Sequence, residues 1–208
     1  MATRLRQMKM GALIWLAGLV PAHAETGFAV VSGNWAGPEG GGVFFTATLE
    51  QEADTVRLSI WDVASAGAEA IGEPRLDVDD FALSAYAIEG GQRLEVVTSE
   101  AAIGRGFGSG SILQMVTEFA DEEAKGVSIV QIQSIDGNLL VTGYYHQFEF
   151  YSSFGANPLV FECVVDVWNG TVTVDGTESA LPPMDYEAMR AGGWSFGAAF
   201  DRGWCPRT

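Results

Sequence analysis

Apolar and polar residues alternate along much of this chain with a period of two. In residues 43–49 every odd position is apolar, and Val56, Leu58 and Ile60 alternate with polar residues. The same alternation runs through residues 161–167. This period predicts strands that bury one face in a sheet. We expect strands near residues 27–32, 43–49, 56–60, 81–88, 92–98, 112–119, 127–135, 138–151, 161–167 and 171–175.

Three short turn signals separate some of these strands. They are Gly90-Gly91, Asp136-Gly137 and Asn169-Gly170, each between apolar or alternating runs. Such pairs tolerate the positive φ of tight hairpin turns, and hairpins join antiparallel strands. The predicted fold class is therefore all-β, an antiparallel sandwich or barrel of about ten strands.

Two segments also carry a helical pattern. Ile112, Val116 and Phe119 would share a helical face, but we favour a strand followed by an acidic turn at residues 121–126. Residues 182–192 begin with two prolines and end with a glycine, which is typical of a short helix. We expect this short C-terminal helix to follow the last strand.

The N-terminus has the pattern of an export signal. Three basic residues precede an apolar run of ten residues, and Ala22-His23-Ala24 is typical of a cleavage site. The run is shorter than the roughly 20 residues that span a bilayer, so we expect no membrane insertion. We predict a signal peptide at residues 1–24, a single β-domain at residues 25–208, and a periplasmic or secreted location in a bacterial envelope.

Removing the signal makes the charge more negative. All 27 acidic residues but only 8 of the 11 basic ones follow Ala24, so the net charge changes from −16 to −19. Nucleic acid is excluded as a partner, because binding to phosphates requires clustered Lys and Arg. The expected partner is a small molecule, a glycan or a protein.

Two cysteines and one histidine remain after the signal. In an exported chain, Cys163 and Cys205 most simply form one disulfide. With His146 alone, a zinc site built on several histidines is excluded, and a Ser-His-Asp or Cys-His site would depend on this residue. No Gly-x-Ser-x-Gly sequence provides a nucleophile.

The strand near residues 138–151 holds the candidate ligand-binding residues. Alternation places Tyr144 and His146 on one face and Tyr145 and Tyr151 on the other. Inside a barrel the first pair would line a pocket, whereas an exposed second pair would offer rings that stack on sugars. The alternative is core packing.

Acidic residues give two further candidates. Asp77, Asp79 and Asp80 could provide oxygen ligands for Ca²⁺, although they lack the spacing of an EF-hand and also fit a solvated loop before residue 81. No other cofactor is expected. Glu149 and Glu162 lie on strands that we expect to pair, and are the first carboxylate pair to inspect for glycoside hydrolysis.

Gly33-Asn34-Trp35 resembles the G-x-W sequence with which lipocalin-like barrels open. The resemblance covers three residues and implies a barrel, with no implied ligand.

The function expected from these patterns is non-catalytic binding in the cell envelope. Two alternatives remain. The first is a carboxylate-based hydrolase acting on envelope glycans, which needs two acids facing each other across a cleft. The second is a small outer-membrane β-barrel, which needs strands of about 9–11 residues with an outward apolar band.

Overall fold

The computed structural model describes most of the chain after residue 27. The predicted signal peptide at residues 1–24 and the centre of the glycine-rich loop at residues 104–110 lie outside the described residues. The described ranges are 28–36, 42–52, 55–83, 87–104, 110–120, 122, 124–151, 159–184 and 186–206.

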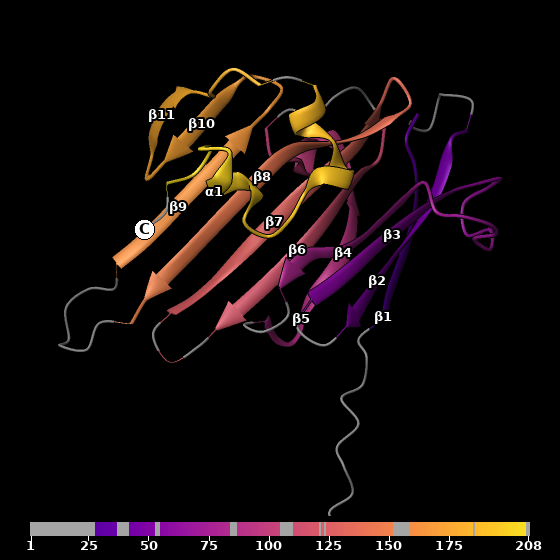
Figure 1. Cartoon of the computed structure of the whole chain (residues 1–208), viewed down its shortest axis with the longest axis horizontal. Helices are drawn as coiled ribbons and strands as arrows, with labels where there is room; N and C mark the ends of the chain where they lie inside the picture. Colours follow the sequence, from indigo (N-terminus) through magenta and orange to yellow (C-terminus); the bar gives the residue numbers. More distant parts are fainter. Residues whose placement is uncertain are drawn as a thin grey trace, which may run out of the picture.

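The strands of the described ranges form two antiparallel sheets (Figure 1), which confirms the all-β fold class. One sheet has the order β1-β2-β3-β4, and the other has the order β11-β10-β9-β8-β7-β6-β5. The strands do not close into one barrel, so the barrel implied by Gly33-Asn34-Trp35 is wrong. The strands are β1 (Phe28–Asn34), β2 (Phe44–Glu52), β3 (Thr55–Val63), β4 (Leu76–Leu83), β5 (Ala87–Val97), β6 (Ile112–Ala120), β7 (Ala124–Ile135), β8 (Asn138–Phe150), β9 (Leu159–Asp166), β10 (Thr171–Val174) and β11 (Thr177–Ala180).

Two of the three predicted hairpins are confirmed. Asp136 and Gly137 both have positive φ, at 49° and 76°, and join β7 to β8. Gly170 has φ 63° and ends a four-residue turn between β9 and β10. The turn at Gly90-Gly91 is wrong, because both glycines lie inside β5. The pairing of β5 with β6 shifts register between Ala87 and Gln92, so an irregularity in a strand takes the place of the turn.

The two sheets share one hydrophobic core. Phe45 and Ile60 from the four-stranded sheet and Leu113 and Ile132 from the seven-stranded sheet are fully buried in it. We call the side of the seven-stranded sheet that packs into this core its inner face, and the opposite side its outer face. The first two strands of the smaller sheet approach β5, which places that sheet at the β5 end of the larger one (Figure 1).

A C-terminal segment, residues 186–206, packs on the inner face. The disulfide between Cys163 of β9 and Cys205 is confirmed and attaches this segment to the sheet. Trp194 and Trp204 of this segment are buried in the core.

The short C-terminal helix is also confirmed, as α1 (Ala198–Asp201), further along the chain than expected. Residues 182–192 contain the 3₁₀ turn η2 (Glu187–Met189) and the start of η3 (Ala191–Gly193) instead. In the part of the chain that the structure describes, no helix is long and apolar enough to cross a membrane.

A buried amide network closes one end of the outer face. Gln131 is fully buried, and its amide accepts a hydrogen bond from the backbone N–H of Ile103 at 2.8 Å and donates one to the Ile103 carbonyl at 3.4 Å. The same amide contacts Gln114 and Thr142, both at 3.2 Å. Ile103 follows η1 (Ser99–Ala101). These bonds hold the segment over the outer face, because an unpaired amide would be costly there.

Candidate functional site

Strand β8 divides the four predicted ligand-binding residues between two faces. Tyr144 and His146 lie on the inner face and are 1% and 6% exposed. Tyr145 is half-buried and lies on the outer face, where Tyr151 follows the end of the strand and is 45% exposed. The structure therefore separates the first pair from the second by the thickness of the sheet.

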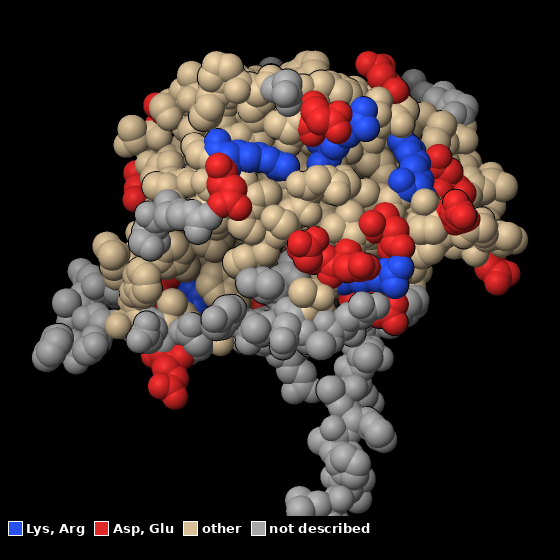
Figure 2. Space-filling model, in the orientation of Figure 1, with Lys and Arg blue, Asp and Glu red and all other residues tan. Residues whose placement is uncertain are grey.

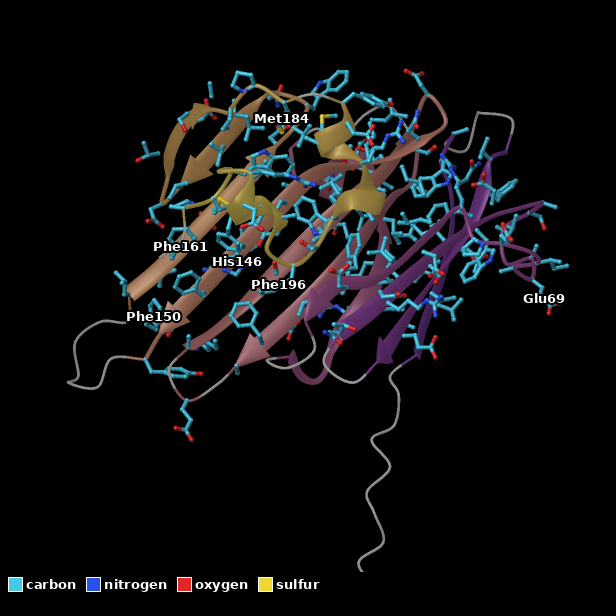
Figure 3. The ribbon with its side chains drawn as sticks, viewed as in Figure 1. Glu69, His146, Phe150, Phe161, Met184 and Phe196 are labelled. Carbon is cyan, nitrogen blue, oxygen red and sulfur yellow. A yellow bond between two sulfur atoms is a disulfide. The ribbon has the colours of Figure 1, made fainter. Side chains whose placement is uncertain are left out.

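His146 is surrounded by aromatic rings (Figure 3). Phe119 stacks with it at 5.7 Å between ring centroids, and Phe200 of α1 meets it edge-on at 5.4 Å. Its Nδ1 atom is buried and has no hydrogen-bond partner among the residues that the structure describes. Burial lowers the pKa of His146 to about 4, so the ring is neutral near pH 7. A neutral ring packed among aromatics fits a core position better than a catalytic one.

Tyr144 also belongs to the core. Its hydroxyl lies 3.2 Å from Ser128 Oγ, and burial raises its pKa to about 12. A cavity beside it has a volume of about 10 Å³ and is lined in part by Ser128, Phe81 and Phe196. A space of this size holds one water molecule at most. The inner face therefore offers no room for a larger ligand at Tyr144.

An open depression of about 450 Å³ lies at the ends of β6, β7 and β8. Strand alternation assigns most of its lining side chains to the outer face, and we call the depression the outer trough. Gly126 is one of its lining residues, and a Cβ atom there would collide with the carbonyl of Gln147 and the ring of Phe119. The outward residues of the trough are Glu118, Ala120, Lys125, Val127, Gln147, Glu149 and Tyr151.

Tyr145 fixes the polar groups on the β9 side of the trough. Its hydroxyl donates to Glu162 at 3.1 Å and lies 3.2 Å from Gln147 Oε1. Burial and the neighbouring Glu162 carboxylate raise the pKa of Tyr145, because both disfavour the phenolate. Tyr145 therefore supports the trough from beside it and orients Gln147.

Ion pairs fix the polar groups on the β5 side. Lys125 Nζ lies 3.4 Å from Glu149 Oε2 across β7 and β8. Arg93 of β5 contacts Glu118 and Glu95, both at 2.6 Å, and these two carboxylates raise the pKa of the guanidinium. The trough thus presents an amide, a cation and two carboxylates held by these contacts, together with the exposed ring of Tyr151.

The predicted carboxylate pair lies on this same face. Gln147 is directly opposite Glu162, and Glu149 is two residues further along β8. Glu149 is engaged by Lys125, and Glu162 accepts the Tyr145 hydroxyl. Both carboxylates therefore have structural partners on the outer face.

The three aspartates proposed for Ca²⁺ lie in β4, so the solvated loop predicted before residue 81 is wrong. Arg57 Nε contacts Asp77 at 2.8 Å and Asp79 at 3.4 Å. The hydrogen bonds from Arg57 and Ser59 lower the pKa of Asp77 to about 2. In the ranges that the structure describes, no group of three or more His, Cys, Asp or Glu side chains could hold a metal ion.

These features define the class of fold: an antiparallel β-protein of two sheets, with a disulfide-bound C-terminal segment and an open trough on its larger sheet. Comparisons with protein-family models, with curated proteins and with solved structures found no match.

Proposed function

We propose that this chain is an exported, non-catalytic binding protein and that its outer trough binds a glycan chain. The observation that carries the proposal is the exposed ring of Tyr151 beside the pre-positioned polar groups of Gln147, Glu149 and Lys125. Sugar hydroxyls both donate and accept hydrogen bonds, so an amide, carboxylates and an ammonium group can all serve them. The face of an aromatic ring packs well on the C–H side of a sugar.

The form of the trough favours a glycan over the other two ligand classes that the sequence leaves open. Small-molecule sites bury most of the ligand surface, whereas this depression is open along one side. The centres of protein interfaces are depleted of charged residues, whereas Glu118, Lys125 and Glu149 all line this depression. An open trough whose largely apolar floor is edged by an ion pair, an amide and an exposed ring fits a short stretch of an extended polymer.

Replacing Tyr151 by alanine is expected to weaken glycan binding about tenfold, because an aromatic anchor at a binding site contributes more than 1 kcal/mol. A glycan array on the chain from Glu25 onward would identify a ligand, and calorimetry with that oligosaccharide would measure its affinity. Trp168→Ala is the matched control, because Trp168 is 53% exposed but does not line the trough.

Unchanged affinity in the Tyr151→Ala variant, or an array with no ligand, would contradict the glycan site. Release of reducing ends from a bound oligosaccharide would instead support the carboxylate hydrolase, with Glu149→Gln as the first variant to assay.

The export part of the proposal rests on the basic, apolar and A-x-A pattern of residues 1–24. A disulfide persists in oxidising compartments, which is consistent with the same location. N-terminal sequencing of the chain expressed in a bacterium is expected to start at Glu25, in the periplasmic or secreted fraction. Retention of Met1 in a cytoplasmic fraction would overturn this part.

A further inference from the structure

A second open depression is separate from the outer trough. It lies between the β7–β8 turn and the 3₁₀ turns of the C-terminal segment. Its volume is about 430 Å³, within the range of small-ligand sites. We call it the arginine groove and define it by Arg75, Gly137, Glu187, Arg190, Gly192 and Gly193.

The charge of the arginine groove is opposite to that of the chain. The structure describes only six Lys or Arg side chains, and two of them, Arg75 and Arg190, line this groove. Among the described residues, Glu187 is the only acidic one in the lining. Figure 2 shows several Lys and Arg side chains across the upper half of the face that it presents. A local positive site on an acidic protein selects for a compact anion.

The two guanidinium groups are held before any ligand arrives. Arg75 donates to Asp62 at 2.9 Å and to Ser134 at 2.8 Å, and its side chain is only 20% exposed. Arg190 is held through Nε, 2.9 Å from Glu187, and half of its side chain is exposed. Among the described residues, the terminal Nη groups of Arg190 have no partner. Those two groups form the planar fork that binds a carboxylate or a phosphate in a bidentate way.

Glycine backbone forms part of the groove lining, beside Leu76, Asn138 and Leu139. A Cβ atom on Gly137 or Gly193 would meet nothing within 4 Å, so the space above both residues is open. Gly193 is fixed by its N–H, which donates to the Arg190 carbonyl at 3.2 Å, and by its own carbonyl, which accepts from Arg202 at 3.0 Å. Because glycine has no side chain, nothing at these two positions stands between a ligand and the arginines.

We infer that the arginine groove is a second binding site, which takes an anionic group, a carboxylate or a phosphate, on Arg190 and Arg75. This site is independent of the glycan proposal, because no residue lines both depressions.

The inference is tested by titrating the chain from Glu25 onward with inorganic phosphate and, separately, with succinate at constant ionic strength. NMR chemical shifts of the Gly192 and Gly193 amides report binding at the groove. Removing the fork in Arg190→Gln is expected to weaken binding about tenfold, because a hydrogen bond between charged groups is lost. Glu187→Gln is expected to tighten binding, since it removes the carboxylate charge that competes with the anion for Arg190, while the amide oxygen can still accept from Nε.

Arg57→Gln is the matched control. It removes one positive charge, as Arg190→Gln does, but Arg57 lies outside the groove and contacts Asp77 and Asp79. It is expected to bind both anions as the unmodified chain does. A preference for phosphate or for succinate would assign the ligand as a phosphoryl or a carboxylate compound. Absence of binding by both anions, or equal weakening in Arg190→Gln and Arg57→Gln, would overturn the inference.

Discussion

Replacing Cys163 and Cys205 together by alanine is expected to lower the free energy of unfolding by about 4 kcal/mol, because the unfolded chain is then no longer restrained by the loop that the bridge closes. The bridge spans 42 positions of sequence and attaches the C-terminal segment to β9. Urea denaturation of the oxidised chain and of the variant would measure the difference. Both positions are changed because a single substitution would leave a free thiol in the core.

Reduction of the unmodified protein is the control for this result. With dithiothreitol present throughout, its midpoint in urea should approach that of the double variant. A loss of stability below about 1 kcal/mol would contradict the prediction and mean that packing of Trp194 and Trp204 alone holds the segment.

Lowering the pH from 6.5 to 4 is expected to destabilise the protein through His146 by about 3 kcal/mol, since its pKa is about 4 in the folded chain and about 6.5 in the unfolded one. Between these values the unfolded state binds the proton and the folded state does not. The stabilisation is therefore fully present above pH 6.5 and is lost as the pH falls towards 4.

The His146→Phe variant isolates this effect. Phenylalanine fits the surrounding rings and does not titrate, whereas the carboxylates act alike in both proteins and cancel in the difference. Free energies of unfolding measured in urea at several pH values should differ least between the two proteins near pH 7 and most near pH 4, where only the unmodified protein has lost the His146 contribution. Parallel profiles for the two proteins would show that His146 is solvated in the folded state.

The local patterns of the chain predicted most of the strands, because alternation and positive-φ turn residues act over a few residues. Asp136-Gly137 shows this well, since both residues adopt the conformation that their types favour. Asp175-Gly176 carries the same signal and joins β10 to β11, although this hairpin was not among those predicted. Gly90-Gly91 carries a similar signal but stays in a strand, because pairing with β6 absorbs the irregularity.

Less of the candidate site than of the fold could be predicted from the sequence. Alternation placed Tyr145 and Tyr151 on one face of β8, yet nothing local linked them to Lys125 or Glu118 on other strands. That link needs the register of β6 and β7, which pairs Ala120 with Lys125. The acidic turn at residues 121–126 indicated this hairpin but not its register. The arginine groove joins Arg75 to Arg190, and no periodic pattern connects positions so far apart.

The two faces of β8 contribute to different parts of the protein, and this affects which substitutions the chain can tolerate. Substitutions at Gln147, Glu149 or Tyr151 change side chains that line the outer trough, while the inner face packs around His146, and Phe119 and Phe148 border both. An insertion of one residue would exchange the two faces and bury the polar set. The outward side chains of this strand can therefore be varied by point substitution while the core around His146 is kept, whereas a change in length within the strand disrupts both faces.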